Sequence, residues 1–244
     1  MPAGSVAALS AAASAALCWV GPVVIARLPE PAPEAGDDQT DGDVAASAAA
    51  KVPYTQIAAR PRLRVELAVA GALVGALVGW RLGWEPILAG WVYLGAVGVV
   101  LAYVDARTRL LPTRIIAPSY AILGCLVVVA GLLDGDVDRL VRSALGWLVF
   151  GGFYVALWLV YPRGLGYGDV RLSGLLGLAL GYVGWPAVLT GLYAGFVLGG
   201  LGGVVLAALR TGDRRHFAFG PFMLLGSFVG LIWGQSFGGW YTSR

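Results

Sequence analysis

The stretch Gly166-Tyr167-Gly168-Asp169-Val170-Arg171 leads into a long apolar segment that runs from Val170 to Leu209. It places a carboxylate at the boundary of that segment, between glycines that leave the neighbouring backbone accessible. A second carboxylate, Asp105, ends another apolar segment 64 residues earlier. Ionisable side chains at the edge of hydrocarbon are costly, which makes both acids candidates for a functional site.

The composition indicates a membrane protein. Of the 244 residues, 58% are hydrophobic and only 13% are charged, whereas an ordinary globular domain has roughly 25% charged residues. Most of the chain must therefore face lipid or other apolar helices. The net charge of +3 does not indicate nucleic-acid binding. In a membrane protein, the positions of the lysines and arginines determine its orientation in the bilayer.

The expected fold is an all-α, polytopic membrane bundle of about eight transmembrane helices. Residues 1–26 contain the first span, residues 27–64 form a flexible loop rich in Pro, Gly and Asp, and residues 65–244 form a polytopic membrane domain with the catalytic site. Gly184-Trp185-Pro186 divides the 40-residue segment 170–209 into two spans, because Gly and Pro interrupt helices. The other spans are expected at residues 65–80, 86–104, 115–133, 140–161 and 217–233.

The lysines and arginines predict the orientation. With the N-terminus outside, 13 of the 17 basic residues fall in inside loops and 4 fall outside, as the positive-inside rule requires. This orientation places Asp105 and Asp169 on the cytoplasmic side. Glycines spaced by four residues at 71, 75 and 79, and again at 191, 195 and 199, predict close packing of helices within the chain.

Two carboxylates that approach each other cannot both ionise, so such a pair shares one proton. The ionised member can take a proton from water while the protonated member donates to a scissile carbonyl oxygen. This chemistry needs no metal and no other cofactor. The alternative is that each acid is a boundary residue paired with a nearby arginine, Asp105 with Arg107 or Arg109 and Asp169 with Arg171.

The residues around the acids suit a peptide substrate. Gly166 and Gly168 allow a substrate backbone to come close, and Pro112 turns the chain after the Asp105 segment. Phe219-Gly220-Pro221-Phe222 lies at the start of the last apolar run. The glycines around Asp169 do not form a nucleotide-binding loop, because no strand precedes them and no Walker lysine follows.

In these segments the chain resembles the bacterial type IV prepilin peptidases, the leader peptidase family of Gly-x-Gly-Asp membrane aspartic proteases. The resemblance is carried by residues 105–112, 166–171 and 219–222, and faintly by residues 52–67. It implies that the protein lies in the bacterial cytoplasmic membrane and removes the basic leader from prepilins or pseudopilins at the cytoplasmic face. Asp105 and Asp169 correspond to the catalytic pair, and Gly166, Gly168, Pro112, Gly220 and Pro221 shape the substrate-binding loops.

The chain departs from many members of that family in one respect. Residues 27–64 contain no cysteine, which excludes the paired-CxxC zinc site that many members carry there and puts their N-methyltransferase activity in doubt. The shorter peptidases of tight-adherence systems also lack this site. We expect the acids between Glu30 and Asp43 to interact weakly with a basic leader.

Two other functions stay open. Membrane proteases of the presenilin or signal-peptide-peptidase type also pair a first aspartate with Gly-x-Gly-Asp, but they have a different companion motif from Phe-Gly-Pro-Phe. A transporter with two functional carboxylates is the other alternative. Transporters usually show internal repeats, and no clear repeat is visible in this sequence.

Overall fold

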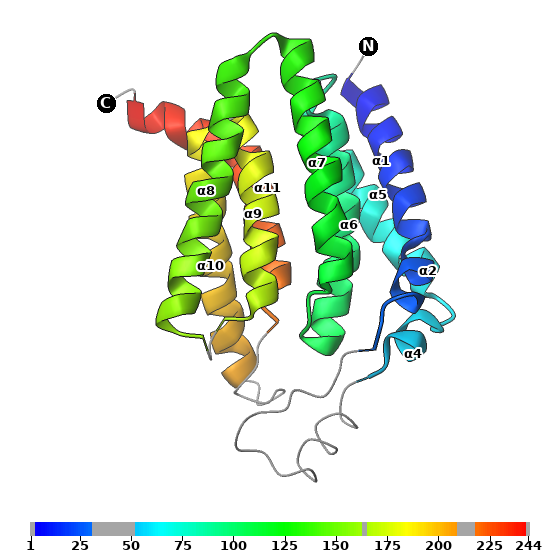
Figure 1. The fold of residues 1–244 in the computed structure, drawn as a ribbon. Helices are drawn as coiled ribbons and strands as arrows, with labels where there is room; N and C mark the ends of the chain where they lie inside the picture. The colour runs from blue at the N-terminus through cyan, green and yellow to red at the C-terminus, as the bar shows by residue number, and fades with distance from the viewer. Residues whose placement is uncertain (1–2, 31–51, 163–164, 209–217, 243–244) are drawn as a thin grey trace.

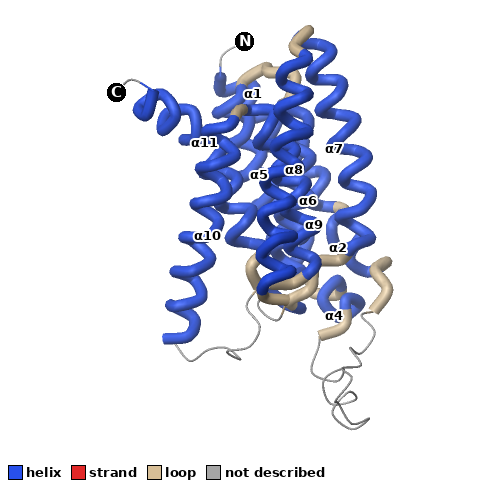
Figure 2. The backbone as a smooth tube through the Cα atoms, turned by 60° about the vertical axis from the view of Figure 1, so that its left-hand side comes forward, coloured by secondary structure: helices blue, strands red, loops and turns tan. Residues whose placement is uncertain are grey.

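The structure is a computed structural model that describes residues 3–30, 52–162, 165–208 and 218–242. It is a bundle of long helices that run roughly side by side, and Figure 2 shows no strand in the described part of the chain. The helices are α1 (Ala3–Trp19), α2 (Gly21–Ala26), α4 (Tyr54–Ala58), α5 (Leu63–Leu82), α6 (Leu88–Thr108), α7 (Thr113–Asp134), α8 (Val137–Val160), α9 (Tyr167–Val183), α10 (Trp185–Ala208) and α11 (Gly220–Thr242).

Within the described residues, six segments are long and apolar enough to cross a membrane: residues 4–26 and the helices α5, α6, α7, α8 and α10. The predicted all-α membrane bundle is thus confirmed as a fold class, and each of the eight predicted spans overlaps a helix or the α1–α2 pair. Helix α9, with 17 residues, is shorter than the roughly 20 residues of a typical span. The count of eight and the N-terminus outside stay predictions.

The predicted break in the segment 170–209 is present. Helix α9 ends at Val183, Gly184 has a φ of +148°, and α10 begins at Trp185. Residues with a side chain rarely adopt this backbone torsion, which explains why a glycine occupies the position. Pro186 lies in the first turn of α10, where its missing N–H removes no helical hydrogen bond.

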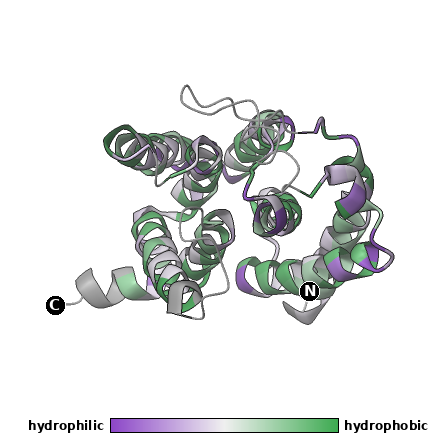
Figure 3. Cartoon of the chain, turned by 90° about the horizontal axis from the view of Figure 1, so that it is seen from below, coloured by the Kyte–Doolittle hydropathy of each residue, from purple (hydrophilic) through white to green (hydrophobic). Residues whose placement is uncertain are grey.

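Both predicted rows of glycines lie at helix contacts within the chain. An added Cβ on Gly71, Gly75 or Gly79 would come within 3 Å of atoms in α1, so α5 and α1 pack with their backbones close together. In the second row, Gly191 and Gly195 face the backbone of α11. The outward faces of the helices carry many exposed large apolar side chains, and Figure 3 shows the hydrophobic colour around the outside of the bundle. These are the features of a multi-pass membrane protein.

The helices alternate in direction, so the connections fall into two sets (Figure 1). The α6–α7 turn, the start of α9 and the start of α11 lie at the end that we call the acid end. The α5–α6 and α7–α8 turns lie at the opposite end. Three arginines that were predicted to be outside, Arg81, Arg139 and Arg142, belong to the opposite end. The predicted inside residues Lys51, Arg163, Arg210, Arg214 and Arg215 lie outside the described residues.

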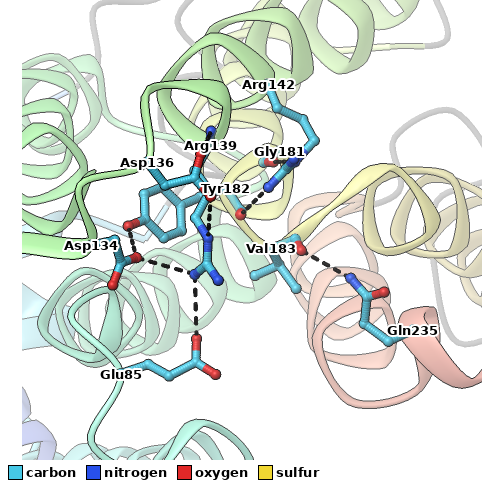
Figure 4. Close-up of polar contacts among 9 residues, drawn as sticks. All are labelled: Glu85, Asp134, Asp136, Arg139, Arg142, Gly181, Tyr182, Val183 and Gln235. Atoms are coloured by element: carbon cyan, nitrogen blue, oxygen red, sulfur yellow. Dashed lines mark hydrogen bonds and ion pairs between the residues drawn. The ribbon is translucent and has the colours of Figure 1, made fainter. Parts of the chain in front are cut away.

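At the opposite end, a polar network connects three parts of the bundle (Figure 4). The guanidinium of Arg139 lies 3.1 Å from Asp134, 3.2 Å from Asp136 and 3.8 Å from Glu85. The Tyr182 hydroxyl donates to Asp134 at 2.5 Å, and Arg142 donates to the carbonyls of Gly181 and Tyr182. This network connects the α5–α6 turn, the α7–α8 turn and the end of α9.

Residues 27–64, predicted to be a flexible loop, contain the short helix α4. Its first residue, Tyr54, is 3% exposed, and Ile57 is buried beside it. A five-residue helix is too short to give a periodic pattern in the sequence, so the prediction missed it. Helix α5 also begins at Leu63, two residues before the predicted domain boundary.

Candidate active site

Asp105 lies in the last turn of α6 and is 4% exposed. Its Oδ2 accepts a hydrogen bond from the backbone N–H of Gly220, with the two atoms 3.0 Å apart. Helix α6 ends three residues later, where Arg109 adopts a left-handed conformation with a φ of +57°. The first acid is therefore held by the N-terminus of α11, where free backbone N–H groups favour a negative charge.

Asp169 is the third residue of α9 and is 8% exposed. Its Oδ2 accepts from the backbone N–H of Gly166, the residue that precedes the helix, at 3.2 Å. An acid at this position commonly caps a helix in that way. Its other oxygen, Oδ1, is buried without a hydrogen-bond partner among the described residues, which is an uncommon and costly state for a carboxylate.

The helix starts next to the two acids converge on Leu111, in the α6–α7 turn. A Cβ added to Gly168 would lie 2.7 Å from the Cβ of Leu111. A Cβ added to Gly220 would lie 3.3 Å from Leu111 Cδ1 and 2.8 Å from the Oδ2 of Asp105. The starts of α9 and α11 thus approach the same leucine.

The predicted loop residues lie around this point. Gly166 precedes α9 and Gly168 is its second residue; Pro112 precedes α7; Gly220 and Pro221 begin α11. Gly168 and Gly220 are places where no side chain fits without displacement of a neighbour. The structure therefore places all seven predicted site residues at the acid end, while their roles in catalysis stay predictions.

The alternative of simple ion pairs has no support in the described part of the chain. Neither acid forms a salt bridge there. The guanidinium of Arg171 hydrogen-bonds to Thr113 and lies 4.3 Å from the centre of the Tyr167 ring. Arg107 lies over the ring of Tyr103. The arginines near the acids are thus engaged with hydroxyl groups and aromatic rings.

Sequence reasoning missed two side chains near the acids. Leu111 was noted only as part of a motif, although it is the contact between two helix starts. Tyr154 of α8 is fully buried, its hydroxyl has no hydrogen-bond partner among the described residues, and its ring centre lies 6.2 Å from that of Phe219, the residue before Gly220. It lies within an apolar run, Gly151 to Val160, where nothing in the sequence distinguishes it from a packing residue.

No group of three or more His, Cys, Asp or Glu side chains that could hold a metal ion occurs among the described residues. Cys18 is buried and Cys125 is exposed, and both are free thiols. The polar groups of the site include the two carboxylates and the backbone N–H groups of Gly166 and Gly220.

Residues 92–234 match the model of the type IV leader peptidase family. The chain belongs to the type IV leader peptidase family. The match includes Asp105 and Gly220, which are joined by a hydrogen bond, and Asp169 in the first turn of α9 at the same end of the bundle.

Relatives of this leader peptidase family member are named prepilin leader peptidase/N-methyltransferase. One from Aeromonas salmonicida is 32% identical over 164 residues, which cover 63% of this chain and 54% of the relative. One from Escherichia coli is 34% identical over 149 residues, covering 60% of this chain and 64% of the relative. One from Pseudomonas aeruginosa is 28% identical over 139 residues, covering 56% and 47%. The matches thus span about half to two thirds of these relatives. No solved structure gives a significant match.

Proposed function

We propose that this protein is an aspartic endopeptidase that removes the leader from type IV prepilins or pseudopilin-like proteins at the cytoplasmic face of the bacterial membrane. The observation that carries the proposal is the convergence at Leu111 of the helix ends that carry Asp105 and Asp169, both buried and both free of ion pairs among the described residues. Membership of the leader peptidase family and the names of the relatives support the substrate class.

In the proposed reaction the two carboxylates share one proton. The ionised carboxylate accepts a proton from a water molecule, whose oxygen forms a bond to the scissile carbonyl carbon. The protonated carboxylate donates its proton to the carbonyl oxygen. The resulting gem-diol intermediate collapses as the C–N bond breaks. The leaving amine takes up the proton removed from the water, and one hydroxyl of the diol returns a proton to the carboxylate that donated it, which restores the shared proton. The peptide bond is hydrolysed without a covalent enzyme intermediate.

The hydrogen bonds of the two carboxyl groups support these roles. Asp105 and Asp169 each use Oδ2 to accept one backbone hydrogen bond, which fixes the orientation of both carboxyl groups. Asp169 Oδ1 has no such contact among the described residues. We assign this atom the contact with the attacking water, since a buried acceptor gains most from a partner.

The relatives' names include N-methyltransferase, but we propose only the peptidase activity for this chain. Residues 27–64 lack the cysteines of a paired-CxxC zinc site. The other membrane proteases with a Gly-x-Gly-Asp motif are a weaker alternative because of the family match. A transport function is not favoured either, because both acids lie at one end of the bundle.

The test is co-expression with a candidate prepilin, with cleavage followed by the gel shift of the substrate. Asp105→Asn and Asp169→Asn should each abolish processing while the protein still inserts. Asp138→Asn, a change in the exposed turn at the opposite end, is the matched control and should cleave normally. Cleavage by Asp105→Asn or by Asp169→Asn would contradict the catalytic role of the acid pair. Mass spectrometry of the new N-terminus should show no methyl group, and a chelator should have no effect.

A further inference from the structure

The guanidinium of Arg171 connects the start of α9 to the start of α7. Arg171 lies two residues after Asp169, and its Nη1 donates a hydrogen bond to the hydroxyl of Thr113, the first residue of α7. The guanidinium also lies over the ring of Tyr167, the first residue of α9, 4.3 Å from the ring centre. A cation that faces an aromatic ring is attracted to it. The guanidinium is therefore held between a ring of its own helix and a hydroxyl group of another helix.

Helix α7 makes a second hydrogen bond to the same residue of α9. The hydroxyl of Tyr120 donates to the backbone carbonyl of Arg171, with the two oxygen atoms 2.6 Å apart. Tyr120 lies seven residues after Thr113 on α7, and seven residues make about two helical turns. Thr113 and Tyr120 therefore lie on the same face of α7, and that face holds both the side chain and the backbone of residue 171.

These contacts lie beside a close approach of the two segments that carry the acids. The α6–α7 turn follows the helix end with Asp105 and leads into Thr113. Gly168, in the first turn of α9, packs against Leu111 of that turn. This packing limits how closely the start of α9 can approach the turn, because a further approach would make atoms overlap. The hydrogen bond from Arg171 to α7 keeps the same two segments from moving apart.

A direct effect of its positive charge on the acids is the alternative role for Arg171. No ion pair joins Arg171 to Asp169 or to Asp105 in the described part of the chain. The side-chain contacts that Arg171 does make there are with uncharged groups, a hydroxyl and a ring. A role through charge would not need the hydroxyl of Thr113, whereas a role through position would. This difference makes Thr113 the informative residue to change.

We propose that Arg171 is a positioning residue for Asp169, and that it acts through the hydroxyl of Thr113 by fixing the first turn of α9 against the α6–α7 turn. The proposal rests on the peptidase function of the acid pair. Two carboxylates that share a proton must be held within a fraction of an ångström of the productive geometry. Helix ends fray readily, and Asp169 lies in the first turn of α9, so contacts from outside that helix keep the acid in place.

The test measures kcat and KM for prepilin cleavage by the full-length protein and by Arg171→Met, Thr113→Val and the double variant. Arg171→Met keeps most of the length of the side chain but removes its donor, and Thr113→Val keeps the shape but removes the hydroxyl. We expect each single variant to lower kcat by about three- to tenfold with little change in KM, the size of effect expected when one hydrogen bond is lost. The double variant should lose no more than the more impaired single variant, because all three lack the same bond.

Two variants with the same chemical changes serve as matched controls. Arg62→Met removes an exposed arginine at the acid end. Thr55→Val removes a hydroxyl that donates to Glu30 at 3.2 Å, an acid that also accepts from the backbone N–H of Tyr54 at 2.9 Å and so caps α4. The other acids of that loop, at residues 34–43, lie outside the described residues. Both control variants should cleave at the wild-type rate.

Hydrogen exchange gives a readout that does not depend on catalysis. In Arg171→Met and Thr113→Val, the amides of residues 169–173 should exchange about three- to tenfold faster than in the wild type, with no such change in the two controls. Wild-type kcat or wild-type exchange in both variants would overturn the positioning role. So would a loss of kcat in Arg171→Met that Thr113→Val does not share, or losses that multiply in the double variant.

A wild-type protein that cleaves no prepilin would reject the peptidase function separately. Faster exchange in Arg171→Met and Thr113→Val would then still support the anchoring of α9 to α7 by this hydrogen bond. Thr113 is exposed, so Thr113→Val tests the proposal even where Arg171→Met does not fold.

Discussion

The backbone N–H of Gly220 donates a hydrogen bond to the carboxylate of Asp105, a residue 115 positions earlier in the chain, over a distance of 3.0 Å. This bond connects the end of α6 with the first residue of α11. Asp105 is therefore oriented by a helix from the other half of the sequence. The glycine is required for space as well as for its N–H, because the position of its missing Cβ is next to the carboxylate oxygen.

Gly220→Ala should impair cleavage strongly. The added methyl group would lie 2.8 Å from Asp105 Oδ2 and 3.3 Å from Leu111 Cδ1, so either the acid or the turn must move. We expect a loss of about 10- to 100-fold in kcat, because displacements of about 1 Å at reacting groups have effects of this size. The measurement is the rate of prepilin cleavage by purified variants. Gly200→Ala, where a Cβ meets nothing within 4 Å, should retain full activity.

Gly168→Ala should also impair cleavage, and its rescue should depend on which atoms are removed from Leu111. The added Cβ would lie 2.7 Å from the Cβ of Leu111. Leu111→Ala keeps that atom, so the double variant Gly168→Ala/Leu111→Ala should remain as impaired as Gly168→Ala. Leu111→Gly removes the atom and should restore part of the activity. Equal rescue by both changes at Leu111 would contradict the packing described here. The assay is again the cleavage rate, compared at equal amounts of inserted protein.

Arg139→Gln should lower stability without affecting the chemistry of the acid pair. It removes the cation that joins Asp134, Asp136 and Glu85 at the opposite end (Figure 4). Partly exposed ion pairs contribute little individually, so we expect the free energy of unfolding to fall by about 1 kcal/mol. Thermal unfolding in detergent measures the effect, and Arg62→Gln, an exposed residue at the acid end, is the control. Loss of prepilin cleavage at temperatures where Arg139→Gln is folded would contradict this assignment.

Two tyrosine-to-phenylalanine changes should have opposite effects on stability. Tyr154 has a buried hydroxyl without a partner among the described residues, and its ring packs against Phe150, Phe196 and Phe219. Tyr154→Phe keeps the ring contacts and removes the unsatisfied group, so the fold should be equally stable or more stable by about 1 kcal/mol.

The hydroxyl of Tyr182 donates a hydrogen bond to Asp134. Tyr182→Phe removes this bond and should destabilise the protein by about 1 kcal/mol. Melting temperatures of both variants in the same detergent show whether each substitution raises or lowers the stability of the protein. A clear loss of stability in Tyr154→Phe would show that its hydroxyl has a partner in the folded protein. The pair is matched because each tyrosine is buried in the bundle and each substitution removes a single oxygen atom.

The sequence was sufficient for features that repeat or that depend on neighbouring residues. Apolar length predicted the helices, Gly184 and Pro186 predicted the break before α10, and glycines four residues apart predicted the close approach of α5 to α1. The positions of Asp105 and Asp169 at helix ends also followed from polarity alone. Each of these features is set by residues within one or two helical turns.

The remaining features depend on contacts between distant residues. Glu30 caps α4 from 24 residues away, and Leu111 meets the starts of α9 and α11 only because the bundle brings three helix ends together. Tyr154 lies in an apolar helix and is distinguished by its surroundings, not by its neighbours in sequence. Such contacts leave no periodic pattern, so a single sequence does not reveal them.

The bond between Gly220 and Asp105 also sets an order of events during biosynthesis. Ribosomes synthesise the chain from its N-terminus, so α6 and α9 are made before residue 220. Until α11 arrives, Asp105 lacks the amide that orients it. Under the proposed function, we therefore expect a nascent chain to contain both acids without a completed site, and cleavage to begin only when the last helix is in place.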